Sequence, residues 1–113
     1  MSSCAGRNRG TRPGRYLALL LAVGLAACAG DGSPAGRGRN VYLAQCSTAC
    51  HNSDPSKDGP LGPAIKGSSR ELLEARVLRG AYPPGYKPKR GTAVMQPMPQ
   101  LTASIDDLAA FLK

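Results

Sequence analysis

Two cysteines and the only histidine of the chain lie together in the segment CSTACH, residues 46–51. Two thiols can form a disulfide, bind a metal together with an imidazole, or bond covalently to a haem. Three residues separate Cys46 from Cys50, and His51 follows Cys50 directly. Covalent haem attachment usually has two residues in this gap, so the segment is one residue longer than that pattern.

The two chemistries without haem remain open, although each has a weakness. A disulfide between Cys46 and Cys50 would close a small loop and would therefore give little entropic stabilisation. A structural zinc ion takes four ligands, whereas Cys46, Cys50 and His51 supply three and no second cluster supplies a fourth. A non-haem protein with a local disulfide or a metal site is thus one alternative interpretation.

The residues before this segment have the spacing of one helix face. Gly38, Tyr42 and Cys46 follow one another at intervals of four. Together with Cys50 and His51, they resemble the N-terminal helix of the small single-haem cytochromes c. This resemblance implies an all-α cytochrome c fold, in which about three helices pack around one haem c bonded to both cysteines.

Residues 61–67, LGPAIKG, are similar to the loop that this family has on the histidine side of the haem. The resemblance implies that the carbonyl oxygen of Pro63 accepts a hydrogen bond from the ring of His51. Such a bond selects the tautomer of a ligating histidine and orients its ring.

A haem that transfers electrons needs a second axial ligand, and His/Met is a usual pair in cytochromes c. Met95 and Met98 are the candidates, because Met1 lies in the N-terminal segment described below. Met95 lies where the family has its ligand, seven residues before Thr102, whereas Met98 lies four residues before it. The resemblance therefore assigns the iron to His51 and Met95, with Met98 as the alternative sixth ligand.

Two more helices are needed to position these residues. The segment Ser68-Ser69-Arg70-Glu71 predicts a capping box that opens a helix running to about Arg79, with Gly80 as its terminator. Residues 81–100 contain five prolines and two glycines, which predicts an irregular loop carrying the methionine ligand.

The last helix is predicted from apolar residues at helical spacing, which are Ile105, Leu108, Ala109 and Leu112. Thr102 or Ser104 would open it. Phe111 lies where the family has an aromatic residue that packs on the first helix, so we expect it against Gly38 and Tyr42.

Residues 1–27 have the form of an export signal. Four arginines without an acidic residue precede the apolar stretch 16–27, which is too short to span a bilayer as a helix. Its end, Leu25-Ala26-Ala27-Cys28, resembles the signal of bacterial lipoproteins, in which the chain is cut before the cysteine and the cysteine is acylated. The resemblance implies lipidation at Cys28. More than one acyl chain at this residue would give a stable membrane anchor.

Three segments follow from this pattern. They are a removed signal peptide at 1–27, the lipidated Cys28 with a flexible tether to residue 36, and the cytochrome c domain at 37–113. The formal charge of +8 falls to +4 without the four arginines of the signal. Basic charge therefore gives no argument for a nucleic-acid partner, and we expect an exported protein, periplasmic or on the cell surface, that is anchored to a membrane.

The function expected from these observations is electron transfer. The chain has no tryptophan and few aromatic residues, so a small domain of this composition needs a staple such as a bound cofactor. Haem c would be that staple, and redox proteins would be the partners of a carrier that is not itself an enzyme. The other interpretation with haem is an enzyme or gas sensor whose sixth ligand is labile.

Overall fold

The structure is a computed structural model that describes residues 31–91 and 94–113. These residues contain three α-helices and no strand, which confirms the prediction of an all-α protein. The helices are α1 (Pro34–Gln45), α2 (Arg70–Leu73) and α3 (Ile105–Leu112); a π-helical turn η2 (Glu74–Leu78) continues α2, and a 3₁₀ helix η3 (Pro99–Ser104) leads into α3. The predicted signal peptide and Cys28 lie outside the described residues.

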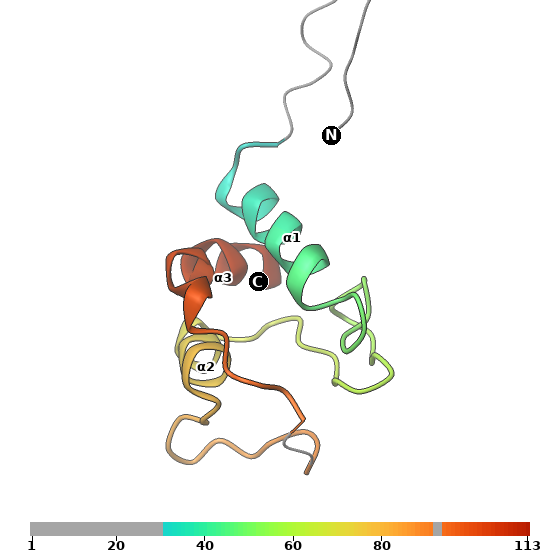
Figure 1. Ribbon diagram of the computed structural model, residues 1–113, viewed down its shortest axis with the longest axis vertical. Helices are drawn as coiled ribbons and strands as arrows, with labels where there is room; N and C mark the ends of the chain where they lie inside the picture. Colours follow the sequence, from blue (N-terminus) through green and yellow to red (C-terminus); the bar gives the residue numbers. More distant parts are fainter. Residues whose placement is uncertain (1–30, 92–93) are drawn as a thin grey trace, which may run out of the picture.

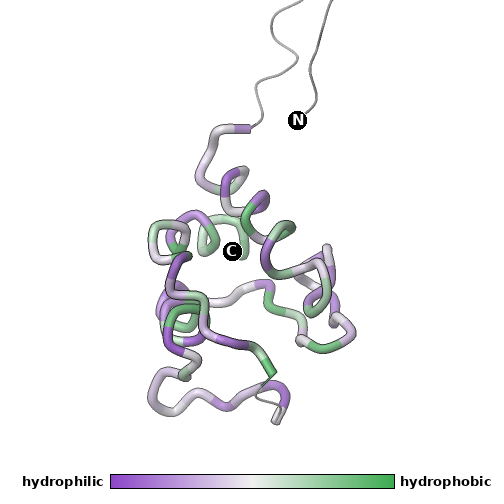
Figure 2. Tube along the Cα trace, in the orientation of Figure 1, coloured by the Kyte–Doolittle hydropathy of each residue, from purple (hydrophilic) through white to green (hydrophobic). Residues whose placement is uncertain are grey.

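The helices gather at one side of two long irregular segments (Figure 1). Helix α3 packs mainly on α1 and makes a smaller contact with α2. Apolar residues concentrate on α2, α3 and the second half of α1 (Figure 2). The buried core consists of Tyr42, Leu73, Val77, Leu101, Ile105, Leu108 and Leu112. Within the described residues, no helix is both long enough and apolar enough to cross a membrane.

Helix α1 begins earlier than the sequence predicted. The hydroxyl of Ser33 accepts a hydrogen bond from the amide of Gly36 at 3.0 Å, and Pro34 occupies the first helical position. Both features favour a helix start, because serine caps the first turn and proline has no amide to leave unpaired. Residues 34–36, which were assigned to the flexible tether, are therefore the first turn of the domain.

The start of α2 also differs from the prediction by one residue. The hydroxyl of Ser69 accepts from the amide of Leu72 at 3.1 Å, so Ser69 is the N-cap. Ser68 instead donates to the carbonyl oxygen of Ile65 at 2.6 Å, and the predicted capping box between Ser68 and Glu71 is wrong. The predicted terminator is confirmed, since Gly80 follows the helical segment with a φ of 66°.

Helical backbone before α3 begins at Pro99 rather than at Thr102 or Ser104. The hydroxyl of Thr102 donates to the carbonyl oxygen of Pro99 at 2.7 Å, and Ser104 makes no side-chain cap. The prediction for the opening residue was wrong because proline suits a first helical turn and the buried Leu101 draws this turn onto the core.

Gly38 allows α1 and α3 to cross closely. A Cβ atom at this position would overlap the carbonyl oxygen of Asp107 and lie 3.0 Å from the amide nitrogen of Leu108. One turn further along α1, the ring of Tyr42 packs on that of Phe111 with their centroids 5.4 Å apart, which confirms the predicted contact of Phe111 with Tyr42. The crossing is thus set by an absent side chain on one turn and an aromatic pair on the next.

We predict that Gly38→Ala lowers the free energy of unfolding by about 1–3 kcal/mol, because the added methyl overpacks a backbone contact. Helix propensity alone predicts the opposite sign, a gain of about 1 kcal/mol. Urea unfolding of both proteins measures the difference. Gly32→Ala is the control, since a Cβ there meets nothing within 4 Å. An unchanged or raised stability of Gly38→Ala would show that the crossing is not close-packed.

Candidate cofactor site

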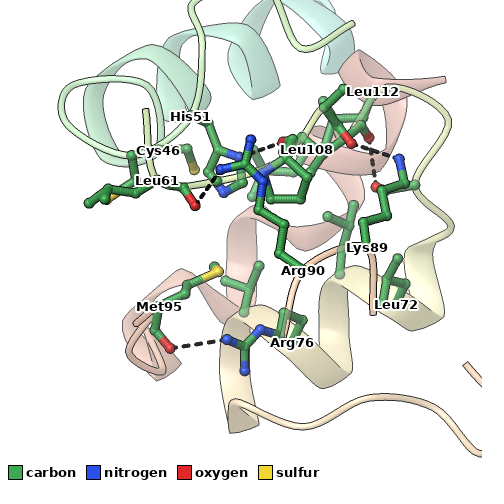
Figure 3. Close-up of a pocket in the computed structure, with 18 of the residues that line it drawn as sticks. Cys46, His51, Leu61, Leu72, Arg76, Lys89, Arg90, Met95, Leu108 and Leu112 are labelled. Carbon is green, nitrogen blue, oxygen red and sulfur yellow. Dashed lines mark hydrogen bonds between the residues drawn. The ribbon is translucent and has the colours of Figure 1, made fainter. Parts of the chain in front are cut away.

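An apolar cavity lies between the segment after α1, the helical segment α2–η2 and the segment before η3 (Figure 3). It is open to solvent on one side, and about 1030 Å³ free of protein atoms lies within it when that open space is counted. Its walls include Leu72, Leu73 and Val77 from α2 and η2, and Leu108 and Leu112 from α3. A cavity with this apolar lining suits an organic cofactor rather than a single ion.

The cavity brings together residues that the sequence analysis selected from distant segments. Cys46, Cys50 and His51 line it from the α1 side, and Met95 reaches it from the opposite side with its sulfur directed inward (Figure 3). Both cysteines are free thiols. The predicted set of two thiols, one imidazole and one thioether therefore shares a single cavity.

The structure separates the two methionines. Both methionines pack against the buried core, but Met95 also lines the cavity and Met98 does not. The amide of Met98 donates to the carbonyl oxygen of Val77 at 2.6 Å. This bond ties the methionine segment to the end of η2 and leaves Met95 at the cavity wall, which favours Met95 over Met98 as a ligand.

The extra residue of CSTACH is accommodated by a wide turn. The amide of His51 donates to the carbonyl oxygen of Cys46 at 3.0 Å, five residues back instead of the four of an α-helix. Ser47 donates its hydroxyl to the carbonyl oxygen of Leu43 at 3.0 Å and thereby satisfies the end of α1. Thr48 and Ala49 are exposed, so the turn extends outward and keeps Cys46, Cys50 and His51 at the cavity.

Burial raises the pKa of the Cys46 thiol to about 11, and the neighbouring Cys50 contributes in the same direction. The thiol is therefore neutral at ordinary pH and is not activated as a thiolate nucleophile. This environment fits a cysteine that is held against an apolar group rather than one that performs nucleophilic catalysis.

The imidazole of His51 is oriented by the loop that follows it. Its Nδ1 lies 3.0 Å from the carbonyl oxygen of Pro63, so the contact expected for these two residues is present. A carbonyl only accepts, so Nδ1 carries a proton, and in the neutral form of this imidazole Nε2 is the nitrogen with the lone pair. A Cβ atom at Gly62 would lie 2.5 Å from Nδ1 and 2.8 Å from Nε2, so only glycine leaves room for the ring.

A network of backbone bonds holds this loop. The carbonyl oxygen of Cys50 accepts from the amides of Leu61 and Gly62, at 3.2 and 2.8 Å. Pro55 accepts in the same way from Ile65 and Lys66, at 2.8 and 2.9 Å. Residues 59–66 therefore fold back onto the cysteine turn and carry the Pro63 carbonyl to the histidine.

Tyr42 has a role in the site that the sequence analysis missed. Its side chain is fully buried, and its hydroxyl donates to the carbonyl oxygen of Asn52 at 2.5 Å. Asn52 directly follows His51, so this bond fixes the backbone beside the histidine. Burial, followed by the charges of Cys46 and Asp54, raises the pKa of Tyr42 to about 12. The helix-face pattern identified Tyr42 as a core residue but contained no signal for its partner.

Basic side chains and exposed apolar residues surround the cavity mouth. Lys89 donates to the carbonyl oxygen of Ala64 at 2.7 Å, and Arg90 donates to that of Leu61 at 2.9 Å. These bonds join the segment after Gly80 to the histidine loop. Leu61, Tyr82 and Val94 are exposed apolar residues, and all three line the same cavity.

The chain matches no family model, and no curated protein or solved structure matches it either. The case for a function therefore rests on the residues of the cavity and on their geometry.

We predict that Tyr42→Phe lowers the free energy of unfolding by about 1–2 kcal/mol, because it leaves the carbonyl of Asn52 without its donor. The loss should also depend on pH. The folded pKa of about 12 exceeds the ordinary value of 10.0, so the unfolded chain ionises first as pH rises. As pH rises between these two pKa values, the free energy of unfolding of the wild type should therefore fall by about 1 kcal/mol more than that of Tyr42→Phe.

Urea unfolding at a neutral pH and at a pH between those two values measures both effects. Tyr86→Phe is the matched control, because it removes a phenol from the stacked pair with Tyr82 outside the core. Equal stability of wild type and Tyr42→Phe at neutral pH would contradict the role given to the Asn52 contact.

Proposed function

We propose that this protein is a cytochrome c, an electron carrier that holds one covalent haem c with His51 and Met95 as axial ligands. The observation that carries the proposal is that Cys46, Cys50, His51 and Met95 line one apolar cavity, although more than 40 residues separate His51 from Met95. The donor set fits this cofactor: two thiols for attachment, one imidazole with its tautomer set, and one thioether opposite.

Each residue has a defined task in this proposal. Cys46 and Cys50 attach the cofactor, Pro63 holds the Nδ1 proton of His51, and Nε2 is presented to the metal. Bound haem supplies an iron that takes up and releases one electron. Because His51 and Met95 would both ligate the iron, no ligand position would be left for a substrate, which supports a carrier rather than an enzyme.

The cavity walls contribute to the same function. Leu73, Val77 and Leu108 are buried apolar side chains that keep water away from the ligands. A dry surrounding is one of the means by which a protein sets a reduction potential. The side of the cavity that opens to solvent would be the route for electrons to and from a redox partner.

The export prediction completes the proposal. A signal at residues 1–27 and lipidation at Cys28 would place the domain on the outer side of a membrane, as a tethered carrier or as the haem subunit of an exported oxidoreductase. The assignment of these residues stays a prediction from the sequence.

A first test is covalent haem. Coexpression with a cytochrome c maturation system should give a band that stains for haem peroxidase activity on a denaturing gel. The intact mass should increase by one haem, and alkylation of free thiols should add nothing at Cys46 or Cys50. The double variant Cys46→Ala/Cys50→Ala should not stain, whereas Ala49→Ser, in the exposed part of the same turn, should stain normally. A wild-type protein without covalent haem would contradict the proposal.

A second test identifies the sixth ligand. A methionine sulfur on ferric haem gives a weak near-infrared absorption band, which Met95→Ala should abolish and Met98→Ala should preserve. Met95→Ala should also let carbon monoxide bind the reduced protein readily, because its sixth position is then open. The opposite result for the two variants would assign the ligand to Met98. Ready carbon monoxide binding by wild type would favour a haem enzyme or gas sensor.

A further inference from the structure

Arg76 contacts the backbone of the residue that we assign as the sixth ligand. This side chain comes from η2 and lines the cavity opposite His51 (Figure 3). Its Nη2 donates to the carbonyl oxygen of Met95 at 3.4 Å, across 19 residues of sequence. The bond is at the long end of the hydrogen-bond range, so its contribution to holding Met95 depends on how firmly the guanidinium is fixed.

Two other contacts hold the guanidinium in place. Nη1 donates to the carbonyl oxygen of Gly80 at 2.7 Å, and the guanidinium carbon lies 4.9 Å from the centre of the Tyr82 ring. Tyr82 in turn stacks on Tyr86, with centroids 5.4 Å apart and planes 9° from parallel. The planar cation is therefore fixed on one face and along one edge, which directs its remaining donors toward Met95.

Two other contacts join the methionine segment to the end of the helical segment α2–η2. The Met98 amide is bonded to the carbonyl oxygen of Val77, and Pro97 lies against Gly80, where a Cβ atom would be 3.0 Å from the proline ring. Both attachments lie on the C-terminal side of Met95. At Met95 itself, Arg76 adds a hydrogen bond to the backbone beside the packing of the side chain on the core, so it limits how far the ligand can move away from the cavity.

We propose that Arg76 is a positioning residue for the sixth ligand, which it holds in place through the Met95 carbonyl. This inference rests on the proposed function, because it assumes a haem whose sixth ligand is Met95. Lysine cannot replace arginine here: its ammonium is a point charge, whereas the guanidinium fork reaches two carbonyls while its face stacks on Tyr82.

The test uses the holoprotein and measures how easily an added ligand displaces the methionine. Imidazole is titrated into the ferric protein, and the near-infrared band is followed together with the apparent dissociation constant. In Arg76→Gln and Arg76→Lys, imidazole should bind about tenfold more tightly than in wild type, because one hydrogen bond no longer retains the methionine. The Lys variant keeps the charge, so a similar gain in both variants assigns the effect to the fork geometry.

Arg79→Gln is the matched control. Arg79 lies three residues further along, is exposed, and pairs with Glu74 at 3.4 Å rather than with the methionine segment. Its imidazole affinity should stay within about twofold of wild type. Should Arg76→Gln fail to fold, Arg76→Lys against Arg79→Gln still decides the question.

The two proposals fail in different ways. A wild-type protein that carries haem and the near-infrared band, with Arg76→Lys indistinguishable from Arg79→Gln, overturns the role of Arg76 alone. A wild-type protein without covalent haem or without the band overturns the proposed function and this inference with it.

Discussion

The hydrogen bond from the Tyr42 phenol to the carbonyl of Asn52 joins the helix crossing to the cavity. The same ring packs on Phe111 of α3 and lines the cavity wall. Because the side chain has no exposed surface, it can rotate only if the core opens. The position of the backbone next to His51 therefore depends on the packing of α1 on α3. That packing is close because Gly38 has no side chain.

The cavity is bounded by two segments that are held by different means. On the histidine side, backbone amides of the 59–66 loop bind the carbonyls of Cys50 and Pro55. On the methionine side, the attachments come from η2: the carbonyl oxygen of Val77, at the helix end, accepts from the Met98 amide, and the Arg76 side chain donates to the carbonyl oxygen of Met95. Lys89 and Arg90 connect the two sides across the mouth. A group bound between them would touch both segments and would supply the contact that the small core lacks.

The longer cysteine gap has a local structural explanation. Its turn is closed by a bond from the His51 amide to Cys46, and its small polar residues bind the last carbonyls of α1. The added residue therefore extends the turn into solvent and does not move the histidine from the cavity. The same environment keeps Cys46 as a neutral thiol, since the thiolate would lie in an apolar space.

The sequence by itself determined what depends on short-range spacing: an all-α chain, the face of Gly38, Tyr42 and Cys46, the terminator at Gly80, and the contact of Phe111 with Tyr42. It also selected five of the residues that line the cavity, which are Cys46, Cys50, His51, Pro63 and Met95. Helix starts were misplaced by a few residues. Ser68 and Ser69 could both cap α2 as far as the sequence shows, but in the structure the Ser68 hydroxyl binds a carbonyl of the preceding loop and Ser69 is the cap.

Only the tertiary structure decided which methionine lines the cavity, which carbonyl Tyr42 binds, and that Arg76 reaches Met95. Each of these contacts joins segments whose separation is set by how the helices pack. Spacing along the chain determines which face of a helix a residue occupies, but it contains no information on what lies opposite that face.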